Sequence, residues 1–450
     1  QVLPAWRRPH RSPANSPRLE MPPIATLAPP RTPAPALALR TVYQPIADIA
    51  TGRPVAFEAL VRGPAGSPLE SPGALFGAAR RHGLLVELDE RCRESAVLGA
   101  HAAGLRTPLF VNVEPDALRA GGVEPLRRLV ATWGSSAHLV LEITERALTQ
   151  RPSELLYFIA AARRLGLRIA LDDVGVDPRS LALMPLVAPD VIKLDMRLVH
   201  EPPSAHTAAV VTAVAAECER SGALLLAEGI EHEEHHRRAR ALGATLVQGW
   251  HLGRPGPLPR DVESSPLPAL PLPPAPAPTP FAAVAPHRPT RQADWRFLLQ
   301  ISHLLEDRAR GLGAEAVVLG AFQSARRFTD DTARRYRALA ESAALVAAFG
   351  VDLDPEPVEG VRGADLRPDD PLGGEWSVVV LGPHFAGALV ARETTHRVRG
   401  SRVFEYAVTH DRPLVVAAAR ALMTKVLPQE GGDAAAPSVL TPARVAASGT

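Results

Sequence analysis

The sequence predicts a (β/α)₈ barrel followed by a smaller α/β domain. Short apolar runs alternate with longer stretches of helical periodicity between residues 41 and 256. This spacing is typical of parallel β/α units, and seven or eight such units fit in about 215 residues. A Pro/Ala-rich stretch then separates this part from a second folded part. An open doubly wound sheet is the alternative, but no Gly-rich phosphate loop follows the first strand, so we favour the barrel.

The 450 residues divide into five segments where the composition changes. A disordered Pro/Arg-rich arm precedes the barrel, and a Pro/Ala-rich linker with extended polyproline geometry follows it. The smaller domain and a disordered, Gly/Ala/Ser-rich tail complete the chain. These five segments are residues 1–40, 41–256, 257–289, 290–427 and 428–450.

The strands and helices follow from the hydrophobic pattern of each segment. In the barrel, the predicted strands end near Leu60, Val113, Ile143, Leu171, Leu194, Ala227 and Val247. The predicted barrel helices lie within 74–103, 152–165, 208–221 and 233–242. In the second domain we expect helices over 295–310 and 413–426, and short strands over 316–319 and 376–381.

The composition excludes several classes of protein. A net charge of +2 with 22% charged residues does not indicate DNA or RNA binding or attachment to a membrane surface. No apolar run is long enough for a transmembrane helix. Cys92 and Cys218 are the only cysteines and lack paired spacing, which fits a reduced compartment. We therefore expect a cytoplasmic protein.

Each predicted barrel strand ends in a polar residue. Catalytic groups lie at the C-terminal ends of the strands in such barrels, so we expect these side chains to converge. Their carboxylate and amide oxygens suit Mg²⁺ or Mn²⁺ better than zinc, and metal-activated water would attack a phosphoester or similar bond. The strand-end residues are Glu58, Asn112, Glu142, Asp172 with Asp173, Lys193 with Asp195, Glu228 and Gln248.

Lys193 is one of only two lysines in a chain that otherwise uses arginine. The adjacent carboxylates of Asp172 and Asp173 can bridge metal ions, and a compact ammonium can position a water molecule beside them. This combination indicates metal-assisted hydrolysis.

The segments around these residues resemble the EAL-domain phosphodiesterases, which hydrolyse cyclic di-GMP to the linear dinucleotide pGpG. The resemblance covers residues 41–256 and implies a modified barrel with an antiparallel first strand, commonly a homodimer. The matching segments are Tyr43–Ile46, Phe57–Arg62, Val111–Asn112, Leu141–Glu145, Leu171–Asp173, Ile192–Asp195, Ala227–Glu231 and Gln248–Gly249.

The resemblance also implies roles for individual residues. Two Mg²⁺ or Mn²⁺ ions would be held by Glu58, Asn112, Glu142, Asp172 and Asp173, with Glu228 nearby. Lys193 would bind the attacking water and Glu231 would brace the loop after Asp173, and we group Asp195 with these catalytic residues. For the substrate, Gln44 would lie near a guanine, Arg62 would meet a phosphate and Gln248 would line the site.

The loop after Asp173 departs from the family pattern. The family usually has an aromatic residue followed by small polar residues, whereas this chain has Val174 and then Val176-Asp177-Pro178-Arg179. In the family this loop couples dimer contacts to the second metal site, and a degenerate loop often accompanies lost activity. We therefore expect a phosphodiesterase, with a catalytically inactive cyclic di-GMP receptor as the alternative. A scaffold that binds no nucleotide is a third hypothesis, which the complete set of polar strand ends disfavours.

The second domain resembles the DICT sensory domain. The supporting segments are Gly320–Gln323, Arg327–Thr329, Arg335–Tyr336, Asp370–Leu372, Glu375–Trp376, Leu389–Arg392, Phe404–Tyr406 and His410–Arg412. No nucleophile, metal cluster or phosphate loop is evident there. We therefore expect a regulatory domain whose ligand or protein partner the sequence does not identify.

Overall fold

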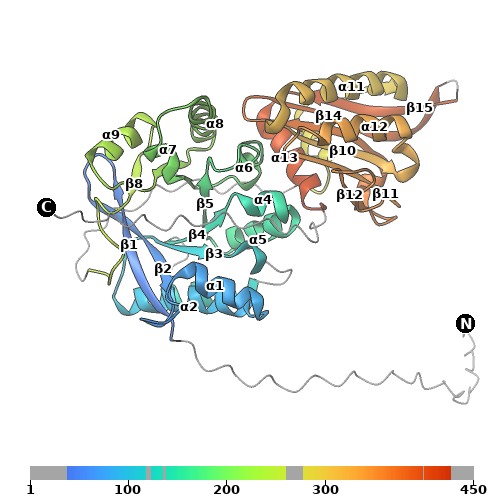
Figure 1. Ribbon diagram of the computed structural model, residues 1–450. Coiled ribbons are helices and arrows are strands. Elements are labelled where there is room, and N and C mark those ends of the chain that lie inside the picture. The colour runs from blue at the N-terminus through green and yellow to red at the C-terminus, as the bar shows by residue number, and fades with distance from the viewer. Residues whose placement is uncertain (1–37, 118–122, 135–137, 260–276, 399, 427–450) are drawn as a thin grey trace, which may run out of the picture. The chain divides into compact units, whose positions relative to one another are not determined.

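The computed structural model describes residues 38–117, 123–134, 138–259, 277–398 and 400–426 (Figure 1). The expected N-terminal arm up to residue 37, the expected tail and most of the expected linker lie outside the described residues. In the described ranges, no helix has the length and apolar character needed to cross a membrane.

The first folded part is a closed barrel of eight strands, which confirms the predicted fold class. The first strand, β1, runs antiparallel to both of its neighbours, β2 and β8, as the family resemblance implies. All other neighbouring strands are parallel. The strands are β1 (Arg40–Asp48), β2 (Pro54–Arg62), β3 (Leu109–Val113), β4 (Leu139–Thr144), β5 (Arg168–Val174), β6 (Val191–Leu194), β7 (Leu224–Ala227) and β8 (Leu246–Gln248).

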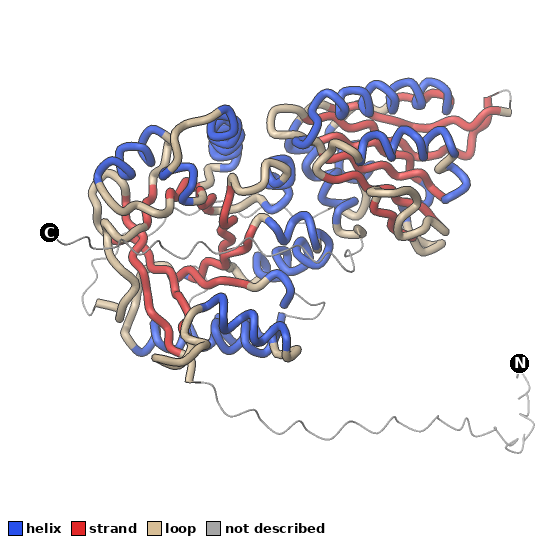
Figure 2. The backbone as a smooth tube through the Cα atoms, viewed as in Figure 1, coloured by secondary structure: helices blue, strands red, loops and turns tan. Residues whose placement is uncertain are grey.

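Helices surround the barrel strands (Figure 2). The stretch predicted as helical over 74–103 divides into two helices, because Gly83 adopts a left-handed conformation with φ +66° between them. The helices are α1 (Pro72–Arg81), α2 (Leu85–Ala102), α3 (Val123–Trp133), α4 (Arg146–Gln150), α5 (Pro152–Arg164), α6 (Ser180–Val187), α7 (Met196–His200), α8 (Ala205–Ser221) and α9 (Glu233–Ala241).

The interior of the barrel is a small apolar cluster. It contains Ala56, Phe110, Val140, Ala170, Val191, Leu226 and Leu246, each contributed by a different strand. The residues that alternate with them along the strands, such as Leu109, Val111, Leu139 and Leu141, belong to the larger cluster outside the strands. This period of two is that of a β-strand buried on both faces, which explains the continuous apolar runs in the sequence.

The C-terminal domain is a seven-stranded mixed sheet with helices on both faces. Its strand order is β12-β11-β10-β13-β14-β15-β9, with parallel pairing only between β10, β11 and β12. The strands are β9 (Arg291–Asp294), β10 (Val317–Ser324), β11 (Leu345–Val351), β12 (Arg362–Asp365), β13 (Glu375–Leu381), β14 (Ala386–Val398) and β15 (Ser401–Thr409). The helices are α10 (Pro280–Val284), α11 (Trp295–Leu312), α12 (Asp330–Ala340) and α13 (Arg412–Met423).

The end of the expected linker is folded. Residues 280–284 form α10, and the Thr279 side chain accepts a hydrogen bond from the backbone N–H of Ala282 at the helix start. Phe281 and Val284 are buried in the apolar layer that also contains α13. An extended spacer up to residue 289 is therefore wrong for this stretch, because two apolar anchors tie it to the C-terminal domain.

Candidate functional site

The polar residues at the strand ends converge because of the same period of two that builds the apolar interior. Each lies two positions after an interior residue of its strand, as Glu142 follows Val140 and Lys193 follows Val191. Side chains at i and i+2 point to the same side of a strand, so these groups project into the barrel at its C-terminal end. The seven residues placed this way are Glu58, Asn112, Glu142, Asp172, Lys193, Glu228 and Gln248.

Lys193 lies at the centre of this group and is only 1% exposed. Its Nζ lies 2.6 Å from Glu142 Oε1, 2.9 Å from Glu228 Oε1 and 3.0 Å from Asp172 Oδ1. Glu58 Oε2 is 3.8 Å away. Burial disfavours the charged ammonium, but the surrounding carboxylates outweigh it and raise the pKa of Lys193 well above its usual range. The side chain is therefore a buried cation.

Glu58 is held by amide donors on both of its oxygens. Asn112 Nδ2 donates to Oε1 at 3.0 Å, and Gln248 Nε2 donates to Oε2 at 2.6 Å. Gln248 Nε2 also lies 3.3 Å from Gln44 Oε1, and Gln44 Nε2 donates to the Gly253 carbonyl at 3.2 Å. Burial would raise the pKa of Glu58, but Lys193 and these amides keep it below its usual value. The chain therefore positions this carboxylate as an anion.

Three further acidic side chains surround Lys193, and fully ionised they would carry more negative charge than one lysine balances. Burial raises the pKa of Glu228 to about 8 despite the nearby ammonium. Burial and the Glu58 carboxylate raise the pKa of Glu142 well above its usual range. Both oxygens of Glu142 and Oδ1 of Asp172 are shielded and, apart from the ion pairs to Lys193, lack a hydrogen-bond partner among the described residues. Such oxygens fit hard divalent cations.

Asp173 is set apart from Asp172 by its backbone. It has φ +60°, and the pairing of β5 with β6 shifts register between Leu171 and Val174. A non-glycine residue in the left-handed region is strained, and such strain is common where a side chain must be re-aimed at a functional site. Carboxylate oxygens of Asp172, Asp173 and Glu228 lie within 4.8 Å of one another. These three residues could hold a second cation.

Glu145, which we had not assigned to the site, anchors the loop after Asp173. Its Oε2 accepts a hydrogen bond from Ser180 Oγ at 2.5 Å, and its Oε1 accepts one from the Asp177 backbone N–H at 2.7 Å. The Gly175 N–H lies 3.4 Å from Oε2. Burial raises the pKa of Glu145 to about 7. In the sequence, the indication that Glu145 belongs to the site was its position in the segment Leu141–Glu145, three residues after Glu142.

The structure corrects the expectation for Glu231. This residue is exposed, and its backbone N–H lies 3.4 Å from His235 Nδ1. The loop that it was expected to brace is instead bound to Glu145, because the turn after β4 lies beside the turn after β5 in the parallel barrel.

Asp195 has a structural contact of its own. Its side chain caps α7 by accepting from the Arg197 backbone N–H at 2.9 Å and from Arg197 Nε at 2.8 Å. Within the described ranges, Asp195 is not among the carboxylates that pair with Lys193. Asp195 therefore lies beside the carboxylate cluster as a helix cap.

A histidine cluster lies next to the site, on the far side of Gly229. His200, Glu231 and His235 each offer a ligand atom within 4.8 Å of the others. However, His200 Nε2 and His235 Nδ1 lie 2.6 and 3.2 Å from the Gly229 carbonyl, and the two rings stack with centroids 4.1 Å apart. These contacts explain the cluster as packing of the turn between β7 and α9.

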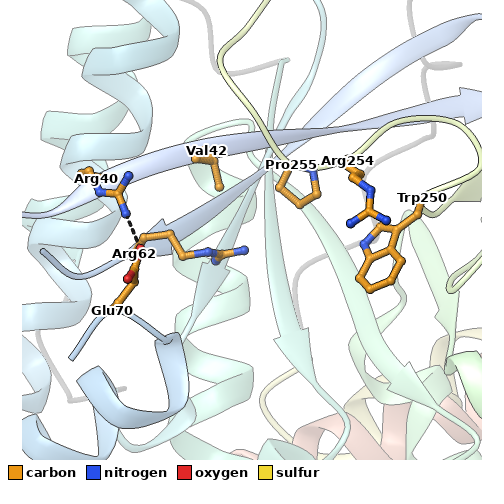
Figure 3. A pocket seen from close by; sticks show the side chains of 7 residues that line it. All are labelled: Arg40, Val42, Arg62, Glu70, Trp250, Arg254 and Pro255. Carbon is orange, nitrogen blue, oxygen red and sulfur yellow. Dashed lines mark hydrogen bonds and ion pairs between the residues drawn. The ribbon is translucent and has the colours of Figure 1, made fainter. Parts of the chain in front are cut away.

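A cavity of about 360 Å³ lies beside the ends of β1 and β2 (Figure 3). Arg62 lies on its wall, with Nη1 donating to the Val61 carbonyl at 2.8 Å. The Arg254 guanidinium lies 4.4 Å from the ring centroid of Trp250 on another part of the wall. The cavity therefore combines guanidinium groups with an aromatic face, which suits a phosphate attached to a planar base.

Comparisons with known proteins match the two folded parts separately. Residues 36–255 match the family model described as "EAL domain", and residues 283–394 match "Sensory domain in DIguanylate Cyclases and Two-component system", abbreviated DICT. The barrel is 31% identical over 226 residues to the cyclic di-GMP phosphodiesterase NbdA of Pseudomonas aeruginosa, covering 48% of this chain and 29% of that protein. It is 30% identical over 230 residues to the bifunctional diguanylate cyclase/cyclic di-GMP phosphodiesterase MucR of the same species, covering 48% and 33%. The chain thus spans about a third of these relatives.

Two solved structures are also similar. A cyclic di-GMP complex of the MucR phosphodiesterase is 27% identical, with a TM-score of 0.44, and covers 49% of this chain and 97% of that one. A manganese and cyclic di-GMP complex of Klebsiella pneumoniae BlrP1 is 27% identical, with a TM-score of 0.43, and covers 50% and 57%.

Proposed function

Because the chain contains an EAL domain of the cyclic di-GMP phosphodiesterase family followed by a DICT sensory domain, we propose that its barrel hydrolyses cyclic di-GMP to linear pGpG. The observation that carries the proposal is the convergence of Glu58, Glu142, Asp172 and Glu228 on the buried Lys193. Every residue type that a two-cation hydrolytic site needs is present, and none is replaced by an apolar residue.

The proposed cofactors are two Mg²⁺ or Mn²⁺ ions. Glu58, Asn112, Glu142 and Asp172 would hold one ion, and Asp172 with Asp173 would hold the other, near Glu228. Bound divalent ions supply Lewis acidity, which activates water and offsets charge on the phosphate. Relatives support this cofactor class, since structures of BlrP1 are described as manganese and calcium complexes with cyclic di-GMP.

The chain's own groups would orient the reactants. Lys193 would hold the attacking water through its ammonium, since three carboxylates within 3.0 Å keep the buried group charged. Arg62 would bind a phosphate at the mouth, with Gln44 near a guanine and Gln248 lining the site. Trp250 and Arg254 extend this proposed substrate surface, because they form the aromatic and cationic wall of the neighbouring cavity.

The anchoring of the loop after Asp173 supports hydrolysis over simple binding. Although Val174 to Arg179 departs from the family pattern, Glu145 binds both Asp177 and Ser180 in this loop. A second candidate function, an inactive cyclic di-GMP receptor, is favoured by the loop composition itself. We also propose that the barrel forms a homodimer, as the family commonly does. Analytical ultracentrifugation of the purified chain tests this proposal.

One assay separates the functions. The purified chain is incubated with cyclic di-GMP and Mn²⁺ or Mg²⁺, and binding and pGpG formation are measured together. If the chain is an enzyme, we expect turnover that the Glu58→Gln variant abolishes. The variant Glu219→Gln, at an exposed position on α8, is the matched control and should retain turnover. Binding without turnover in the unmodified chain would support the receptor. The absence of both binding and turnover would reject both proposed functions.

A further inference from the structure

We propose that the C-terminal domain binds a small planar aromatic anion in a cavity between its sheet and the helices α11 and α12. The cavity has a volume of about 320 Å³, at the small end of the range for ligand sites. Trp295, Leu299, Ser302 and Glu306 line it from α11. Their spacing of three and four residues places them on one helical face, so the helix presents a continuous wall.

Aromatic side chains form part of the cavity wall. Trp295, Phe322 and Trp376 line it from α11, β10 and β13 respectively. Phe322 is fixed edge-on against Tyr336, and Trp376 is fixed edge-on against Phe404, with ring centroids 5.2 and 5.7 Å apart. Phe322 and Trp376 are therefore held in place before a ligand arrives, which favours a planar aromatic occupant.

A shielded donor also lies on this wall. Trp376 Nε1 is buried and has no hydrogen-bond partner among the described residues. A buried indole N–H normally finds an acceptor, so its lack of one is unfavourable in the protein alone.

Two of the four arginines on the wall are already neutralised. Arg335 Nε donates to the buried Glu306 at 2.7 Å, and Arg335 also pairs with Asp331. Arg402 Nε donates to Glu393 Oε1 at 2.9 Å. These ion pairs fix the guanidinium groups and cancel most of their charge, so they shape the cavity more than they attract a ligand.

Arg326 and Arg327 provide the uncompensated charge. Both line the cavity from the turn after β10, and both are exposed. No ion pair of either residue occurs within the described ranges. Two free guanidinium groups at the rim favour a carboxylate or phosphate and disfavour a cation.

The backbone at the cavity is strained in the way that binding sites often are. Gln323, on the wall, has φ +68°, and the pairing of β10 with β11 shifts register between Ala321 and Ser324. The Gln323 side chain is then held by donating to Glu393 Oε2 at 3.1 Å. The bulge ends the regular strand at the cavity and turns the chain towards Arg326.

The size and chemistry together define the ligand class. The aromatic walls suit one or two fused rings, and the rim suits one acidic group on them. Pockets for drug-sized ligands have volumes of about 300–1,000 Å³, and a cyclic dinucleotide is larger than such a ligand. A cavity of about 320 Å³ is therefore too small to enclose a whole cyclic dinucleotide. The proposal does not depend on the activity of the barrel.

Calorimetric titration of the full chain with 2-naphthoate tests the proposal, with neutral 2-naphthamide as the matched ligand. We expect saturable 1:1 binding of 2-naphthoate at least about tenfold tighter than that of the amide, because charge-assisted hydrogen bonds are lost with the amide. 2-Naphthyl phosphate distinguishes the two acidic groups: tighter binding identifies a phosphate site, and weaker binding identifies a carboxylate site. Equal affinity for acid and amide, or no binding of either acid, would overturn the proposal.

Variants locate the binding in this cavity. The double variant Arg326→Gln/Arg327→Gln should weaken 2-naphthoate about tenfold and leave 2-naphthamide unchanged. The exposed Arg337→Gln on α12, which makes the same charge change outside the cavity, should leave both unchanged. Saturating cyclic di-GMP with Mn²⁺ should not displace 2-naphthoate. Displacement, or equal weakening by Arg337→Gln, would place the probe elsewhere and reject the site.

Discussion

The Lys193 ammonium lies 2.6 Å from Glu142 Oε1, and both side chains are almost fully buried. One lysine cannot neutralise Glu142 together with the other three carboxylates around it, so full ionisation of the site is unfavourable and the pKa values of Glu142 and Glu228 are raised. A buried charge without compensation is costly, and added cations relieve that cost.

Replacing the lysine should separate chemistry from binding. Lys193→Ala should lower turnover of cyclic di-GMP by at least about 100-fold, because the water loses its positioning ammonium. Affinity for cyclic di-GMP should remain appreciable, since Arg62 and Gln44 are untouched. Steady-state kinetics and calorimetric binding measure the two effects. Surviving turnover would show that Lys193 does not position the water.

The same variant should also lose stability in a metal-dependent way. Without Lys193 the buried carboxylates are unpaired, and we expect a loss of about 3 kcal/mol in the free energy of unfolding in metal-free buffer. Mn²⁺ should restore part of it. Chemical denaturation with and without Mn²⁺ measures the difference, and an equal loss in both buffers would contradict this account.

Metal addition should stabilise the unmodified barrel. At a free Mn²⁺ concentration about 100 times its Kd, binding to the folded state contributes about 2.7 kcal/mol. Asp172→Asn should abolish most of this gain, because Asp172 is proposed to serve both ions, whereas Glu219→Gln should retain it. Thermal unfolding with Mn²⁺ or EDTA measures the shift. A gain unchanged in Asp172→Asn would remove Asp172 from the proposed ligand set.

The loop anchor should affect catalysis more than binding. Glu145→Ala removes the acceptor for Ser180 and Asp177, so Asp173 should lose its position. A displacement of about 1 Å typically costs about 100-fold, so kcat should fall by that order while KM changes little. Ser180→Ala removes one of these contacts and should have a smaller effect. If KM rose and kcat held, the loop would serve substrate binding instead.

The C-terminal domain should lose stability in acid through Glu393. Hydrogen bonding from Arg402 lowers the pKa of Glu393 to about 2, despite partial burial. A carboxyl whose pKa is lower in the folded state contributes stability above its ordinary pKa, and that contribution disappears as the pH falls towards the folded value. The difference in unfolding temperature between the unmodified chain and Glu393→Gln should therefore be constant above about pH 5.5 and shrink between pH 4.5 and 2. A difference that grew in acid would contradict the assignment.

The sequence predicted the barrel well because its evidence is local. An apolar run such as Leu139–Leu141 identifies a buried strand, and the polar residue Glu142 after it marks the strand's end. In the C-terminal domain the same approach missed α12 and the strands β9, β11, β12, β14 and β15. In β14, the charged stretch from Arg392 to Arg397 hides the alternation, because an exposed strand end needs no apolar side chains there.

The amino-acid sequence by itself determined which residue types stand at the barrel's strand ends. Side chains two positions apart on a strand point to the same side, so the polar residue two positions after an interior apolar residue also faces the interior. Only the tertiary structure decided the contacts among them. Glu145 and Ser180 are 35 positions apart, and their hydrogen bond exists because neighbouring parallel strands bring the two turns together. In the closed barrel the loop after Asp173 binds Glu145, and Glu231 is exposed. No local sequence pattern could distinguish which of the two glutamates holds the loop.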